Sequence, residues 1–196
     1  TSLANSAGGL NSTHTISVAG IYDTVGESID TRTVTIAANA SAKLISDQLN
    51  AQMPNTNVGF TAKTGVVISD ADNDNTITFK LSNNNGGTVT ISANITTDNL
   101  NNLKDAINAQ TGTTGITASN GVVAQDDAGN PIWTLGNDSL LLTHSSGEDI
   151  AITELTGVAL NVRIANFDNT TYEDEANEVS LQAARNLIVN PITSDQ

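Results

Sequence analysis

The chain has 196 residues, of which 38% are apolar, enough to build one large domain or two small ones around a core. Its formal net charge of −14 repels phosphate groups, so nucleic acid and anionic membranes are not expected as partners. No apolar run approaches the ~18 residues of a membrane helix. The sequence has no cysteine, which excludes disulfides and thiolate chemistry.

Residues 1–32 are expected to hold one or two opening strands and a linker. Thr15-Ile16-Ser17-Val18 alternates polar and apolar side chains, and Ile21 follows. The start Thr1-Ser2-Leu3 is polar and small and does not resemble a secretory signal. We therefore interpret the chain as an excised piece of a longer protein.

A duplication dominates the middle of the chain. Thr33-Val34-Thr35-Ile36-Ala37-Ala38-Asn39 recurs almost unchanged as Thr88-Val89-Thr90-Ile91-Ser92-Ala93-Asn94. Shorter motifs downstream recur at a similar offset, which chance matches would not keep. The pattern predicts two tandem units, residues 33–87 and 88–157.

Each unit is predicted to run β-α-β-β. In the second unit, Leu100, Leu103 and Ile107 have helical spacing, and Thr97 or Asp98 could cap the helix. The repeated segment before each helix alternates Thr with Val or Ile, which is typical of a half-buried strand. We expect an α+β fold of mainly antiparallel sheets, each covered by one helix, with flanking strands.

The helix of the first unit is expected to place Leu44, Ile45 and Leu49 on one face. Asn39 or Ser41 would cap its start, and Pro54 would stop it.

Residues 158–196 are expected to hold a closing strand, an acidic loop and a return segment. Val158, Leu160, Val162 and Ile164 alternate as in a strand, and the loop runs from Asp168 to Glu178. The stretch 179–189 fits either a helix or a strand ending before Pro191, and both readings stay open.

Four segments of the second unit resemble the flagellin IN motif of bacterial flagellins. They are Asp105-Ala106-Ile107-Asn108-Ala109-Gln110, Thr114-Gly115-Ile116-Thr117-Ala118, Ser139-Leu140-Leu141-Leu142-Thr143 and Gly147-Glu148-Asp149-Ile150. The first unit matches in part, through Gln48-Leu49-Asn50-Ala51-Gln52 and Val58-Gly59-Phe60-Thr61-Ala62. It lacks the Leu-rich strand and the Gly-Glu-Asp turn.

The resemblance implies a structural protein with no cofactor: the variable outer region of an extracellular filament subunit. Its partners would be other copies of the parent subunit, contacted through terminal regions outside this sequence. Such a domain contributes to filament surface, motility, adhesion and antigenicity, and surface glycans are a further partner that the resemblance allows. An acidic exterior would discourage filaments from bundling.

One acidic turn has the alternation of a calcium loop, with Asp70, Asp72 and Asp74 at every second position. Asn75 stands where such a loop needs Gly, and Leu81 stands where it needs Glu. A solvated hairpin turn is the preferred interpretation, and a structural calcium site is the alternative.

No catalytic constellation is expected. His14 and His144 lie beside Ser or Thr in apparent turns, without a carboxylate at relay spacing, and are interpreted as solvated surface residues. Glu173-Asp174-Glu175 is interpreted as part of an exposed acidic loop.

Two other functions stay open beside the filament subunit. One is the flagellar filament cap, a hook-associated protein with similar domains. The other is a secreted adhesin or a calcium- or glycan-binding module.

Overall fold

The computed structural model describes residues 13–19, 21–22, 25–26, 28–29, 31–54, 56, 58–69, 71–83, 85–125, 131–165, 179–181 and 187–189. The fold is α+β, with antiparallel strand pairs and few helices, as the sequence predicts. None of the helices in these ranges is both long enough and apolar enough to cross a membrane.

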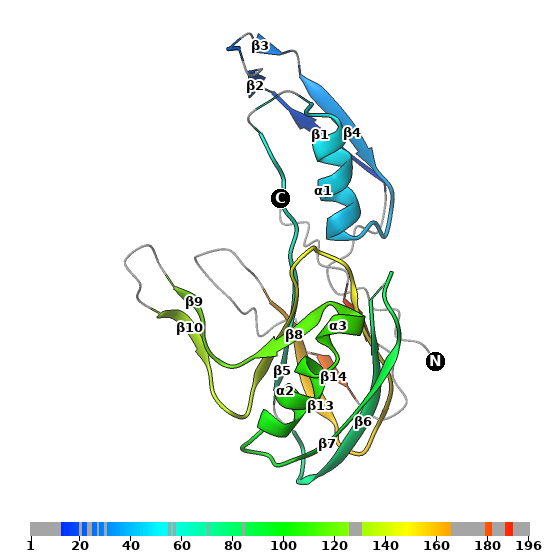
Figure 1. Cartoon of the computed structure of the whole chain (residues 1–196), viewed down its shortest axis with the longest axis vertical. Coiled ribbons are helices and arrows are strands. Elements are labelled where there is room, and N and C mark those ends of the chain that lie inside the picture. Colours follow the sequence, from blue (N-terminus) through cyan, green and yellow to red (C-terminus); the bar gives the residue numbers. More distant parts are fainter. Residues whose placement is uncertain are drawn as a thin grey trace.

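Figure 1 shows two bodies, one above the other. The smaller one contains β1 (His14–Val18), β2 (Ile21–Tyr22), β3 (Ser28–Ile29), β4 (Arg32–Ile36) and α1 (Ala42–Ala51). The larger one contains β5 (Thr64–Ser69), β6 (Asn75–Ser82), β7 (Val89–Ile95), α2 (Asn101–Asn108), α3 (Thr111–Thr114), β8 (Ile116–Ser119), β9 (Gly121–Gln125), β10 (Pro131–Leu135), β11 (Leu140–His144), β12 (Ile150–Thr156), β13 (Leu160–Ile164), β14 (Val179–Leu181) and β15 (Leu187–Val189).

The smaller body has a two-stranded antiparallel sheet, β1 and β4, covered by one helix, and a second short antiparallel pair, β2 and β3. β1 pairs with β4 so that Ile16 lies opposite Val34. The buried core consists of Val34, Ile36, Ala40, Ile45 and Leu49. The apolar alternation in β4 therefore produces the half-buried strand that the sequence predicts.

The start of α1 confirms one of the two expected caps. The Ser41 hydroxyl accepts a hydrogen bond from the Leu44 N–H at 3.2 Å. The expected apolar face is wrong at one position, because Leu44 is 44% exposed whereas Ile45 and Leu49 are buried. The sheet faces the side of the helix that carries Ile45, Ser46 and Leu49, and Leu44 lies just outside it.

The core of the larger body lies between its two larger sheets, and β9 and β10 form a separate antiparallel pair. The strand orders of the two larger sheets are β14-β13-β5-β11-β8 and β15-β12-β6-β7, and both sheets contribute buried side chains to one cluster. Helix α2 packs against β7 and β8, one strand from each sheet. Leu100, Leu103 and Ile107 are fully buried there, which confirms the predicted face.

The start of α2 differs from the expectation. Neither Thr97 nor Asp98 caps it; the cap position is Leu100, whose N–H bonds to the Asn137 carbonyl at 2.7 Å. The Asn99 side chain accepts a hydrogen bond from the Asn101 N–H at 2.8 Å instead. Thr97 and Asp98 form a tight turn closed by a bridge between Thr96 and Asn99.

Strand β11 leads directly into β12, yet the two strands belong to different sheets. β11 lies between β5 and β8, whereas β12 pairs with β6 and β15. The connection, residues 145–149, therefore crosses from one sheet to the other. It reaches the smaller body at the top of the larger one (Figure 1).

The duplicated sequence is used differently in its two copies. β5, from the first unit, is an inner strand paired with β11 and β13, whereas the matching β9 pairs with β10. The closing strand expected from Val158, Leu160, Val162 and Ile164 is present as β13, which begins at Leu160, so Val158 lies outside it. Near the end, β14 and β15 favour the strand interpretation of residues 179–181 and 187–189.

Candidate functional site

The predicted calcium turn is only partly within the described residues. Asp70 lies outside them, and Asp72 and Asp74 are exposed. The Asp74 carboxylate accepts a hydrogen bond from the Thr97 N–H at 2.9 Å, so it joins two turns of the fold. Within the described ranges, no three His, Asp or Glu side chains come together as a metal-binding group.

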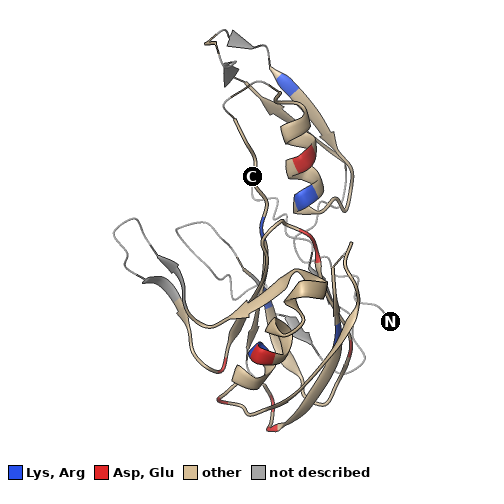
Figure 2. Ribbon diagram, viewed as in Figure 1, with Lys and Arg blue, Asp and Glu red and all other residues tan. Residues whose placement is uncertain are grey.

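Among the residues that the structure describes, charged side chains are scattered over the fold rather than clustered (Figure 2). Two ion pairs, Lys43 with Asp47 and Lys80 with Glu154, have N–O distances of 2.6 Å and lie at the surface, where they add little stability. The acidic loop from Asp168 to Glu178, including Glu173-Asp174-Glu175, lies outside the described residues.

The two histidines have opposite environments. His14 is exposed at the start of β1, as expected. The expectation for His144 is wrong, because its side chain is only 6% exposed. His144 ends β11, which lies between two neighbouring strands, and sequence spacing alone does not reveal that position.

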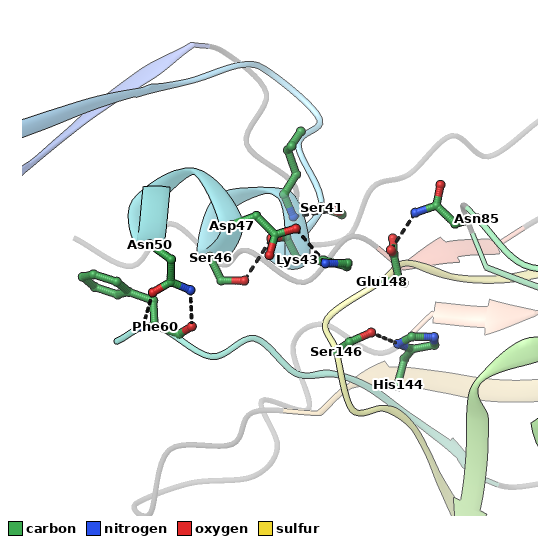
Figure 3. Close-up of polar contacts among 11 residues, drawn as sticks. Ser41, Lys43, Ser46, Asp47, Asn50, Phe60, Asn85, His144, Ser146 and Glu148 are labelled. Carbon is green, nitrogen blue, oxygen red and sulfur yellow. Dashed lines mark hydrogen bonds and ion pairs between the residues drawn. The ribbon is translucent and has the colours of Figure 1, made fainter. Parts of the chain in front are cut away.

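His144 belongs to a part-buried polar cluster at the joint between the two bodies (Figure 3). Its Nε2 lies 3.2 Å from the Asn83 amide nitrogen and its Nδ1 lies 3.2 Å from the Ser146 hydroxyl. Burial lowers the pKa of His144, and the nearby Glu148 carboxylate opposes this effect. The neutral imidazole is therefore favoured in the folded protein.

The turn after His144 is the part of the larger body that contacts α1 in the smaller body. Gly147 has a φ of 76°, and its carbonyl accepts a hydrogen bond from the Lys43 N–H in the first turn of α1 at 2.9 Å. A side chain at this position would collide with Ala62. Glu148 and Asp149 are both 5% exposed, and the Glu148 carboxylate accepts a hydrogen bond from Asn85 at 2.6 Å.

This cluster does not have the geometry of a catalytic relay. The Glu148 carboxylate bonds to Asn85 rather than to the imidazole, and Ser146 follows His144 by only two residues. The side chains of His144 and Glu148 bond to the loop that carries Asn83 and Asn85, and the backbone bond from Lys43 to Gly147 connects α1 to the same turn.

Two asparagines make the same contact in both copies of the repeat. The Asn108 amide donates to the Ala118 carbonyl at 2.9 Å and accepts from the Ala118 N–H at 2.8 Å. The Asn50 amide makes the same pair of bonds to Phe60, both at 2.8 Å (Figure 3). Each asparagine lies at the end of its helix and holds the backbone ten residues later.

We call Asn50 and Asn108 the clamp asparagines. The motif in the sequence includes both residues but does not reveal their role. A signal was nevertheless present, since Asn50-Ala51-Gln52 recurs as Asn108-Ala109-Gln110. An asparagine retained at equivalent helix ends indicates a side chain that bonds to backbone.

An apolar groove of about 450 Å³ lies in the smaller body. It is bordered by three segments, namely β1, the inner side of α1 and the extended residues 60–63. Its lining residues are His14, Thr15, Ile16, Ala42, Ile45, Ser46, Leu49, Phe60, Thr61, Ala62 and Lys63. Ile16 is only half-buried there, although Val34 opposite it on β4 is 6% exposed.

Comparisons with known proteins do not assign the chain to a family. No family model matches it, and no curated protein matches it either.

Proposed function

We propose that the chain is the outer, solvent-facing domain of a bacterial flagellar filament subunit, a structural protein without enzymatic activity. It would assemble with other copies of its parent subunit through other parts of that subunit, outside the cell. The domain would then form the filament surface and contribute to motility, adhesion and antigenicity.

The observation that carries the proposal is the way the motif residues are used. Asn108 clamps the strand that contains Ala118, and Gly147 in the Gly-Glu-Asp turn bonds to α1 of the preceding unit. The residues that carry the resemblance to the flagellin IN motif are thus the ones that connect helix, strand and neighbouring body. That use suits a repeated structural module.

The charge and surface of the chain agree with this role. A formal charge of −14 on each copy would keep neighbouring filaments apart. An outer domain also has to hold its shape under mechanical load, and the buried joint around Gly147 and Glu148 connects the two bodies.

Immunogold electron microscopy tests the proposal. An antiserum raised against the 196-residue chain is applied to intact cells of the bacterium that encodes it and to filaments sheared from them. We expect gold particles along the whole length of the filaments. Particles confined to filament tips would identify the cap protein instead, and labelling of the cell body alone would contradict both.

A further inference from the structure

The smaller body repeats the plan of the larger one up to a point. In the larger body, α2 packs against β7, whose antiparallel partner β6 precedes it in the chain. In the smaller body, α1 packs against β4, whose antiparallel partner β1 also precedes it. The clamp asparagines extend the correspondence, since Asn50 holds residue 60 as Asn108 holds residue 118 in β8.

In the larger body, one strand-turn-strand segment completes this plan. β11 pairs with β8, and β12 pairs with the outer edge of β6. β11 and β12 are consecutive and are joined by the turn that contains Gly147. Leu140, Leu142, Ile150 and Ile152 from these strands fill the core, each at most 1% exposed.

The smaller body shows no equivalent of that segment. The first repeat lacks the Leu-rich strand and the Gly-Glu-Asp turn in its sequence. Among the described residues, β1 has β4 as its strand partner and no strand on its other edge. The apolar groove lies between that edge of β1 and residues 60–63. In the larger body, β6 corresponds to β1 and β8 corresponds to residues 60–63.

We propose that the groove binds a strand-turn-strand segment of another polypeptide, with the chemistry of residues 137–156 of this chain. By the same correspondence, the strand equivalent to β12 would add to the edge of β1 through backbone hydrogen bonds, and the Leu-rich strand equivalent to β11 would lie along residues 60–63. Their apolar side chains would cover Ile16, Leu49 and Phe60. The segment must come from elsewhere because the β11–β12 pair of this chain is bound in the larger body.

Charge agrees with this occupant. The ionisable residues that line the groove are His14 and Lys63, and no lining residue is acidic. The segment 137–156 carries Asp138, Glu148, Asp149 and Glu154 and no Lys or Arg. Its negative charge would therefore meet no acidic side chain in the groove lining.

A labelled synthetic peptide of residues 137–156, added to the whole chain, tests the inference by fluorescence anisotropy. We expect saturable one-to-one binding. Ile16→Glu places a charge in the groove and should weaken binding at least about tenfold. Ser17→Glu, which adds the same charge to the next residue of β1 but outside the groove lining, should leave it within about twofold.

Hydrogen–deuterium exchange locates the peptide and covers the case in which Ile16→Glu fails to fold. The peptide should slow exchange in residues 13–19. Protection of β5 or β8 instead would mean that the peptide replaces β11, and would overturn the proposal, as would the absence of saturable binding. A dimer in sedimentation that the peptide dissociates would assign the groove to a second copy and would also overturn it.

The inference stands apart from the proposed filament function. Peptide binding and immunogold labelling are separate readouts, so the failure of one leaves the other unchanged.

Discussion

The side-chain amide of Asn108 bonds to both backbone groups of Ala118, and so fixes β8 to the end of α2. Asn50 and Phe60 repeat the relationship in the smaller body. An amide side chain is suited to this contact because it offers a donor and an acceptor side by side, like the edge of a neighbouring strand.

Replacing Asn108 with Ala should lower the free energy of unfolding by about 1–3 kcal/mol, since two hydrogen bonds of about 0.5–1.5 kcal/mol each are lost. Urea denaturation followed by circular dichroism measures the change. Asp105→Ala, at an exposed position of the same helix, is the matched control and should change little. Equal effects of the two substitutions would show that the clamp does not stabilise the fold.

Asn108→Asp tests whether the clamp depends on the hydrogen-bond donor of the side chain or only on its shape. The substitution keeps the shape but places a second acceptor against the Ala118 carbonyl oxygen. We expect it to be at least as destabilising as Asn108→Ala in the same urea experiment. A stability equal to that of the unsubstituted chain would contradict the assigned donor.

The buried His144 should make stability depend on pH. Its pKa in the folded chain is lowered from the ordinary 6.5, so the unfolded chain binds the proton more readily. The stability that the folded chain gains from the neutral His144 ring is therefore fully present above pH 6.5. It is lost as the pH falls below 6.5 towards the lowered pKa. Urea unfolding at several pH values through this window measures the slope of the free energy of unfolding against pH.

His144→Gln should reduce that slope relative to the unsubstituted chain. His14→Gln, at the exposed histidine of β1, controls for the loss of a histidine as such. If His144→Gln and the unsubstituted chain lose stability in parallel below pH 6.5, other groups carry the dependence.

Gly147→Ala should weaken the joint between the two bodies. The positive φ strains any other residue, and the new methyl group would meet Ala62 and the Lys43 backbone nitrogen. We expect a loss of about 1–3 kcal/mol in the free energy of unfolding, together with faster proteolysis between the bodies.

Gly112→Ala is the matched control for Gly147→Ala, because a methyl group there meets no atom within 4 Å and Gly112 lies in α3. It should be neutral or stabilising. A Gly147→Ala variant as stable as Gly112→Ala would show that the joint tolerates a side chain.

The spacing of apolar residues along the sequence determined the helices and strands of this protein. It also determined their buried faces wherever the apolar residues lie on a single face. Leu100, Leu103 and Ile107 recur at helical spacing, and all three are buried. β4 follows from strict alternation, and Ser41 follows from the preference of a helix start for a hydroxyl. Such features depend on residues within one or two turns of the chain, so periodicity is sufficient to predict them.

Long-range pairing was decided only by the tertiary structure. Leu44 and Ile45 are adjacent, and only the position of the β1–β4 sheet selects Ile45 for the core. His144 has the local sequence of a surface turn, yet β11 lies between β5 and β8 and its last residue is enclosed. The candidate site arises in the same way: Gly147 lies about a hundred residues from Lys43, and no local pattern encodes their contact.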